Sequence, residues 1–233
     1  MTTYRVEVAI FAIALAVFGL VALALIWSGD WAYAALANAI GNTSATFVVP
    51  PEGRETCGQA MVMDLGMLRG MHRAWAAYVI GASDVAIGPG CSLFTSDERS
   101  HMADVRAVFR GAEYAAALAL FVLVFRMERA RRRGDALRLV RAGSLIAAGI
   151  VAVIGVAAAV AFDPLFLLFH EVFFPQGNFL FAPDSNLLRL YPEWYWQGIT
   201  AGVGASFIAV ALLAAGAAHI ALRRRSNTYT RAA

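Results

Sequence analysis

Four long apolar stretches constrain the fold of this chain more than any other feature. They cover about residues 6–28, 107–125, 142–162 and 196–222. Each is close to the roughly 20 residues that an α-helix needs to cross a hydrocarbon core of about 30 Å. The composition agrees, since 60 % of the residues are hydrophobic and only 15 % are charged. We therefore predict an all-α membrane protein, a single integral membrane domain over residues 1–233 with four transmembrane helices.

The placement of the arginines predicts the orientation of these helices. All 19 basic residues are arginines, and those near the ends of the stretches are Arg5, Arg126, Arg129, Arg131, Arg132, Arg133, Arg138, Arg141, Arg223, Arg224, Arg225 and Arg231. Basic residues near the spans favour the cytoplasmic side. Both termini and the loop between the second and third spans are therefore expected in the cytoplasm. The segments 29–106 and 163–195 are expected together on the extracytoplasmic side, with short interfacial helices.

Two further signals agree with this topology. The run RMERARRRGD could suggest binding to nucleic acid or anionic lipid, but its position between two spans makes it a topology signal, and no nucleic-acid partner is expected. The first apolar stretch is longer than the roughly 7 to 15 residues of a signal-peptide core, so we expect it to remain as an uncleaved helix.

The two cysteines, Cys57 and Cys91, both fall in the first extracytoplasmic segment. An even pair in an oxidising compartment is a disulfide candidate. Neither has neighbouring ligands at the spacing of a zinc site. Within the same segment, Met61, Leu65, Leu68 and Met71 have near-helical spacing, which predicts an amphipathic helix at the membrane interface. His72 is then expected to be an interfacial residue.

The stretch FTSDERSHMADVRAVFRGAEYAAALALFVLVFR predicts a long helix from about residue 96 to 126. Thr95 and Glu98 match a capping box at its start. Glu98, His101 and Asp104 follow one another at three-residue spacing, so they share a face of this helix. The helix is longer than a membrane requires, and its first turns are expected to project from the membrane on the extracytoplasmic side.

The stretch FDPLFLLFHEVFFPQGNF predicts a short helix after the third span. Asp163 and Pro164 suit an N-cap and a first helical position, while Pro175 and Gly177 end the segment. A phenylalanine stripe at helical spacing is formed by Phe162, Phe166, Phe169 and Phe173. The segment is too short to span, and it carries His170. Beyond it, Tyr191-Pro192-Glu193 is expected to open the fourth span.

Three histidines, His72, His101 and His170, are predicted on the same side of the membrane, whereas His219 lies near the cytoplasmic end of the fourth span. His101 and His170 each have a carboxylate at helical spacing, Asp104 and Asp163. Such a carboxylate can orient an imidazole and stabilise its protonated form. An acid/base site on the extracytoplasmic face is therefore plausible from the residues alone.

Other catalytic motifs are incomplete. His170-Glu171 begins like the zinc-protease helix motif HExxH, but Phe174 stands where the second histidine is required. The chain has no Gly-x-Ser-x-Gly elbow, and without lysine it has neither a Ser/Lys site nor a phosphate loop.

Two stretches resemble the bacterial lipoprotein intramolecular transacylases, an integral membrane family. The first is FTSDERSHMADVRAVF, with its His-Met-x-Asp-Val-Arg core. The second is FDPLFLLFHEVFFPQGNFLFAPDSNLLRLYPEWYW, which matches in phenylalanine spacing, the histidine, the Pro-x-Gly-Asn turn and the Tyr-Pro-Glu entry to the last helix. Residues 29–92 show no match, and they leave a different substrate or an accessory surface open.

The resemblance implies an acyltransferase of the bacterial cell envelope, located in the inner membrane. The sn-2 acyl chain of a diacylglyceryl-cysteine lipoprotein would move to the α-amine of the same cysteine, giving the lyso form without a cofactor. Its partners would be the diacylated lipoprotein N-terminus and membrane lipid.

The residues suit this reaction. An α-amine with a pKa near 8 must lose a proton to attack, and a histidine can accept it. We predict His101 and His170 as the acid/base pair, without deciding which is the base. Supporting or oxyanion-binding roles are predicted for Asp104, Arg106, Asn178 and Tyr191, and an acyl-chain groove for Phe166, Phe169 and Phe173.

Two other classes of function stay open at this point. The chain could be a non-catalytic lipoprotein-binding or assembly factor, in which case both histidines would be dispensable. It could also be a metal-dependent membrane hydrolase that uses Glu98, His101 and His170. The predicted role of Glu98 in the capping box makes a metal site less favoured.

Overall fold

The computed structural model of the protein describes residues 2–51, 58–84 and 93–232. The helices are α1 (Thr2–Trp27), α2 (Asp30–Ile40), α4 (Leu65–Val79), α5 (Ser96–Arg132), α6 (Ala136–Val160), α7 (Phe162–Phe173), α8 (Asn186–Leu190) and α9 (Glu193–Ala232). The strands are β1 (Ser44–Val48) and β2 (Ala60–Asp64). The predicted cysteine pair, Cys57 and Cys91, lies outside the described residues.

Among the described residues, four helices are long and apolar enough to cross a membrane: α1, α5, α6 and α9. They correspond to the four predicted stretches, so the predicted fold class is confirmed. Large apolar side chains on them are exposed, such as Phe121 at 68 %, Val153 at 72 % and Leu213 at 74 %. In water such surface would be unfavourable, whereas lipid tails can cover it.

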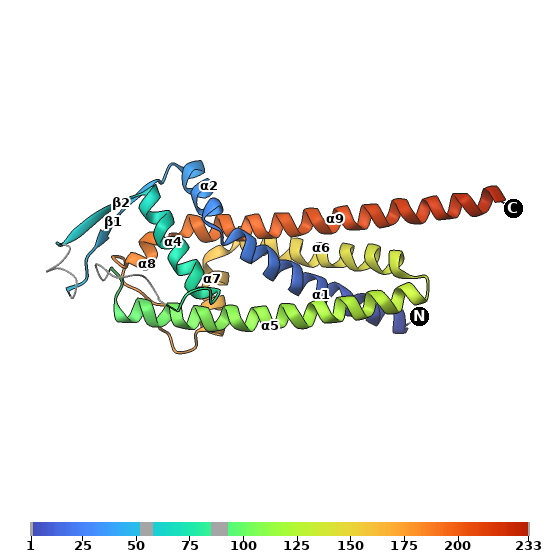
Figure 1. The fold of residues 1–233 in the computed structure, drawn as a ribbon, viewed down its shortest axis with the longest axis horizontal. Helices are drawn as coiled ribbons and strands as arrows, with labels where there is room; N and C mark the ends of the chain where they lie inside the picture. The colour runs from blue at the N-terminus through green and yellow to red at the C-terminus, as the bar shows by residue number, and fades with distance from the viewer. Residues whose placement is uncertain (1, 52–57, 85–92, 233) are drawn as a thin grey trace. The chain divides into compact units, whose positions relative to one another are not determined.

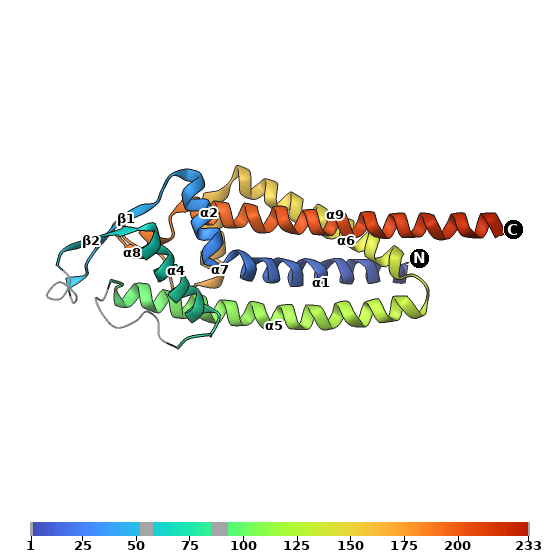
Figure 2. The ribbon, with the colours of Figure 1, turned by 45° about the horizontal axis from the view of Figure 1, so that its top comes forward.

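The chain divides into two compact units, of which the first comprises residues 1–25, 112–160 and 201–233. Its helices run side by side (Figures 1 and 2). One cluster of buried residues consists mainly of small side chains, with Ala12, Ala147 and Ala211 next to Phe207. Gly143 lies directly against the ring of Phe11. Small side chains allow close helix packing within a membrane.

The second unit comprises residues 26–111 and 161–200 and carries three of the four histidines. Its core is aromatic, and Tyr33, Phe47 and Trp75 are each at most 1 % exposed. Strand β1 pairs antiparallel with β2, with Ser44 opposite Asp64. Both strands and α4 lie close together in Figure 1. The core of this unit is thus mixed and aromatic, whereas the packing of the first unit is rich in alanine.

The predicted amphipathic helix over the Met61 region begins later than expected. Residues 60–64 form β2, and α4 begins at Leu65, where the Asp64 side chain caps it by accepting from the Met67 N–H at 2.9 Å. Met61 belongs to the strand, and Leu65 and Leu68 to the helix. The short alternating run before Asp64 has the period of a strand, and it was hidden by residues that also fit a helical spacing.

The short helix after the third span is confirmed, but it begins at Phe162, so Asp163 is not its N-cap. Ala161 occupies the capping position, without a side-chain hydrogen bond. Pro164 fits the first turn, because the N–H groups there have no helical partner. The helix ends at Phe173, and Gly177 adopts a left-handed φ of 77° in the turn that follows. Helix α9 begins at Glu193, as the Tyr-Pro-Glu entry predicts.

Candidate active site

The start of α5 is fixed by the predicted capping box. Thr95 N–H donates to Glu98 Oε2 at 2.8 Å, and Glu98 N–H donates to Thr95 Oγ1 at 3.2 Å. The other carboxylate oxygen of Glu98 accepts from Ser185 Oγ at 2.5 Å and from Leu187 N–H at 3.0 Å. Both oxygens of this buried carboxylate are thus engaged. Within residues 2–51, 58–84 and 93–232, the structure brings together no group of three His, Cys, Asp or Glu side chains that could hold a metal ion.

Two imidazoles face each other one turn further along α5. The rings of His101, from α5, and His170, from α7, are stacked with centroids 6.1 Å apart and planes inclined by 18°. His101 is only 6 % exposed, and His170 is half-buried. The two histidines that the sequence singled out therefore form a pair, although they lie 69 residues apart in the chain (170 − 101).

The tautomer of His170 follows from its neighbour. Nδ1 lies 2.7 Å from the carbonyl oxygen of Phe166. A carbonyl oxygen can only accept, so Nδ1 carries the proton and Nε2 presents its lone pair when the ring is neutral. Burial lowers the pKa of His170, and the Phe166 carbonyl partly offsets this shift. The carbonyl holds the ring in the way that Asp163 was expected to do.

His101 is enclosed by aromatic rings. Its ring centroid lies 4.7 Å from that of Phe174 and 5.5 Å from that of Phe181. In the described part of the chain, its Nδ1 atom is buried without a hydrogen-bond partner. A buried polar atom without a partner costs free energy, so this atom needs an explanation, of which a catalytic role is one.

Asp104 joins α5 to the turn after α7. Its Oδ2 atom accepts from Gln176 Nε2 at 2.7 Å and from Asn178 Nδ2 at 2.5 Å. Asn178 is further held because its Oδ1 atom accepts from Gln176 at 3.3 Å. Asp104 and Asn178 were predicted at the site, and they do meet there. Gln176 was missed, although its position inside the Pro-Gln-Gly-Asn turn was the available signal.

Two predicted residues are engaged elsewhere. Arg106 donates to Asp84 Oδ1 at 2.8 Å, and its guanidinium carbon lies 4.7 Å from the centroid of Tyr78. The Tyr191 hydroxyl lies 3.2 Å from Nδ1 of His72. In the structure both groups thus have partners other than the histidine pair, and their predicted oxyanion-binding role stays a prediction.

The phenylalanine stripe divides into two kinds of side chain. The Phe166 ring lies 4.2 Å from that of His170 and 5.9 Å from that of Trp196. Phe169 and Phe173 are 46 % and 48 % exposed, and their rings lie 4.7 Å apart. Phe166 thus supports the histidine, whereas the other two present apolar surface beside it.

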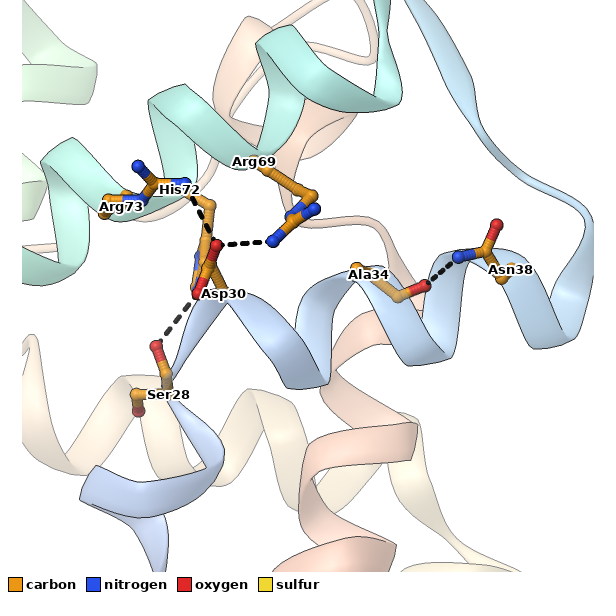
Figure 3. A network of polar contacts seen from close by, with 7 residues as sticks. All are labelled: Ser28, Asp30, Ala34, Asn38, Arg69, His72 and Arg73. Atoms are coloured by element: carbon orange, nitrogen blue, oxygen red, sulfur yellow. Dashed lines mark hydrogen bonds and ion pairs between the residues drawn. The ribbon is translucent and has the colours of Figure 1, made fainter.

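His72, expected at the interface, is instead 2 % exposed in the core of its unit. Its Nε2 atom lies 3.0 Å from the Ser28 carbonyl oxygen, and its ring stacks on Tyr33 at 5.0 Å. Beside it, Asp30 forms ion pairs with Arg69 at 2.8 Å and Arg73 at 3.0 Å (Figure 3). These arginines lower the pKa of Asp30, while burial lowers that of His72.

Together, the four apolar helices and the histidine pair define a multi-pass membrane protein with a candidate acid/base site. The family model described as "Lipoprotein intramolecular transacylase Lit" matches residues 65–196, which include His72, His101 and His170. The match covers more than half of the chain. The chain belongs to this family of acyltransferases, which confirms the resemblance drawn from the two sequence stretches. The match also includes residues 65–92, where the sequence alone showed no resemblance.

Solved structures agree with the fold. The lipoprotein intramolecular transacylase Lit from Bacillus cereus shares 16 % identity, covers 98 % of both chains and gives a TM-score of 0.69. Two variants of that enzyme, in which one histidine is replaced by arginine or by alanine, share 15 % identity at TM-scores of 0.72. They cover 96 % and 97 % of this chain, and 94 % and 96 % of their own. A search of curated proteins gave no match.

Proposed function

We propose that this enzyme transfers the sn-2 acyl chain of a diacylglyceryl-cysteine lipoprotein to the α-amine of the same cysteine. The observation that carries the proposal is the pair of near-parallel imidazoles, His101 and His170, 6.1 Å apart. The amine nitrogen attacks the ester carbonyl carbon, a C–N bond forms, and the bond from that carbon to the sn-2 oxygen breaks. The products are an amide and a free sn-2 hydroxyl, so the reaction needs no external energy source.

In this mechanism His170 is the general base. Its Nδ1–H is held by the Phe166 carbonyl, so the Nε2 lone pair can accept the proton that the attacking amine loses. The lowered pKa keeps the ring neutral at neutral pH and therefore able to accept. The departing sn-2 oxygen then takes up a proton. His101, stacked against His170, donates its own N–H proton to this oxygen and takes up in exchange the proton that His170 accepted, so both rings end neutral.

The tetrahedral intermediate carries a negative oxygen that needs hydrogen-bond donors. Asn178 is the best-placed candidate, because Asp104 and Gln176 hold its amide in one orientation and because its side chain also interacts with His101, whose pKa it raises against the lowering effect of burial. A preorganised donor of this kind is worth far more than a mobile one. Asp104 is thus a positioning residue for Asn178.

The acyl chains need an apolar path to the histidines. The exposed rings of Phe169 and Phe173 on α7 offer such a surface next to His170. We assign them the acyl-chain groove, opening toward the outer leaflet of the inner membrane, with both chain termini in the cytoplasm. The arginine distribution supports this orientation.

The test is to express the chain in a bacterial host that makes diacylated lipoproteins and to analyse N-terminal lipopeptides by mass spectrometry. An N-acyl, lyso-form cysteine is expected with the wild type and with the control His219→Ala, and its loss with His170→Ala. Absence of N-acylation with a folded wild type contradicts the reaction. Full N-acylation by folded His101→Ala and His170→Ala contradicts the residue assignment.

A further inference from the structure

A hollow of about 320 Å³ lies in the same unit as the histidine pair. Three segments line it: residues 48–51 at the end of β1, residues 95–98 at the start of α5, and residues 180–186 before α8. Its volume is at the lower end of the range for ligand sites, which suits a short piece of a larger molecule. The proposed mechanism makes no use of it.

Phe181 connects the hollow to the catalytic histidines. The ring of this residue lies 5.5 Å from that of His101, and the same side chain lines the hollow. Glu98, also in the lining, precedes His101 by one turn of α5. The apolar stretch 107–125 lies in the opposite direction along the helix. The hollow is therefore on the side of His101 that faces away from the membrane-spanning part of α5.

The walls of the hollow are held by long-range hydrogen bonds. Asn186 Oδ1 accepts from Val48 N–H at 3.0 Å, and Asn186 Nδ2 donates to the carbonyl oxygens of Val48 and Leu93, both at 2.6 Å. Glu98 accepts from Ser185 and Leu187. Each of the three segments is thus tied to another, so the hollow is formed before any ligand arrives, which lowers the ordering cost of binding.

The lining combines an apolar surface with negative charge. Leu180, Phe181 and Ala182 supply the apolar part, whereas Asp97 and Asp184 supply exposed carboxylates. Such a surface suits an extended polypeptide with uncharged or basic side chains, and it disfavours acidic ones.

We propose that the hollow binds the first residues of the lipoprotein that follow the lipid-modified cysteine. This inference rests on the proposed function, in which the cysteine amine and the ester lie at the histidine pair and the acyl chains lie on apolar surface. The carboxyl side of the cysteine continues as polypeptide and must leave toward water. The hollow is the lined exit on that side, next to His101, and its binding energy positions the cysteine for reaction.

The test compares synthetic diacylglyceryl-cysteine amides that carry no, two or four further residues, using the full-length enzyme in detergent micelles. The readout is kcat/KM for formation of the N-acyl product, followed by mass spectrometry. With the wild type, kcat/KM should rise about 10-fold between no and two neutral residues and little thereafter. With Ala182→Trp, which fills the hollow, the ratio of kcat/KM between the two-residue and the zero-residue substrate should fall to about 1. Ala39→Trp, an exposed site on α2, should behave as the wild type.

The outcomes separate this inference from the proposed reaction. A rise with peptide length that is the same in Ala182→Trp and wild type overturns the binding site and leaves the reaction intact. No N-acylation of any substrate overturns the proposed reaction itself.

A second measurement does not depend on the folding of Ala182→Trp. A photoreactive benzophenone side chain on the second residue after the cysteine should crosslink to residues 48–51 or 180–186, and crosslinks confined to other segments overturn the site. Substrates with two glutamates should react about 5-fold more slowly than neutral ones, and Asp97→Asn/Asp184→Asn should remove this difference. An unchanged difference overturns the charge argument.

Discussion

The second unit contains two clusters of histidine and aromatic residues, which differ in how many ring nitrogens have hydrogen-bond partners. Around His72, both ring nitrogens have partners, the Tyr191 hydroxyl at 3.2 Å and the Ser28 carbonyl at 3.0 Å. Around His170, the engaged atom among the described residues is Nδ1, which donates to the Phe166 carbonyl. The stacked His101 has a buried Nδ1 atom that lacks a partner among the described residues.

This difference separates His72 from the two histidines proposed as catalytic more clearly than burial does. His72 and His101 are both buried, at 2 % and 6 % exposure. An imidazole with two fixed partners cannot take a proton from a substrate without losing a hydrogen bond, whereas one with a single partner can. The comparison predicts that substitutions around His72 lower the stability of the protein, whereas substitutions at His101 and His170 lower the rate of N-acylation.

The largest effect is expected at the pair itself. His170→Ala should lower the rate of N-acylation by about 10² to 10⁴-fold, the usual contribution of a general acid or base, and His101→Ala by a similar factor. The rate of the double variant should be only slightly lower than that of the less active single variant, because the two rings act as a unit. Single-turnover kinetics on a diacylated lipopeptide measure this, and multiplicative losses would show independent roles.

At the structural cluster, His72→Ala should destabilise the protein by about 2 to 4 kcal/mol, because it leaves a cavity and deprives the buried Tyr191 hydroxyl of its partner. The activity of the molecules that stay folded should change by less than about 3-fold. Thermal unfolding in detergent and activity per folded molecule check both statements. A large loss of activity without loss of stability would contradict a purely structural role for His72.

A smaller effect is expected from Asp104→Asn. This change removes the charge that accepts from Gln176 and Asn178, so Asn178 loses its fixed orientation. We expect kcat to fall by about 10-fold with little change in KM. Asp84→Asn is the matched control, since Asp84 forms an ion pair with Arg106 and its side chain is 94 % exposed. An equal loss in both variants would contradict a role specific to Asp104.

The smallest effect is a pH dependence of stability. Burial lowers the pKa of His72 in the folded state, although the Ser28 carbonyl and Asp30 partly offset this. Below the ordinary pKa of about 6.5, His72 therefore binds a proton more readily in the unfolded chain than in the folded protein. Its contribution to stability is constant above this value and falls as the pH drops through it, by at most about 1.4 kcal/mol per pH unit. His72→Gln should show a shallower decline in melting temperature between pH 7 and pH 5 than the wild type.

Local features of the fold could be predicted from the sequence because their causes are local. The Thr95–Glu98 capping box, the short helix carrying His170 and the four spans each depend on neighbouring residues. The strand at residues 60–64 was missed, since its partner at residues 44–48 is not visible in its own pattern. Pairing between separated segments leaves only a weak local signal.

The candidate site divides in the same way. His101, His170, Asp104 and Asn178 could be predicted from their residue types and from the family resemblance. The roles of Arg106 and Tyr191 stay predictions, and the partners that the structure gives them, Asp84 and His72, lie 22 and 119 residues away in the chain. Only the folded structure shows which polar groups are already engaged.

The buried carboxylate of Glu98 has a consequence for the order in which the chain matures. It binds Thr95 three residues away, but also Ser185 and Leu187, which are 87 and 89 residues further on. During synthesis the cap of α5 forms long before those partners leave the ribosome. The Oε1 atom of Glu98 therefore has no protein partner from this segment until the third span has been inserted. Assembly of the second unit is complete only when Ser185 and Leu187 reach Glu98.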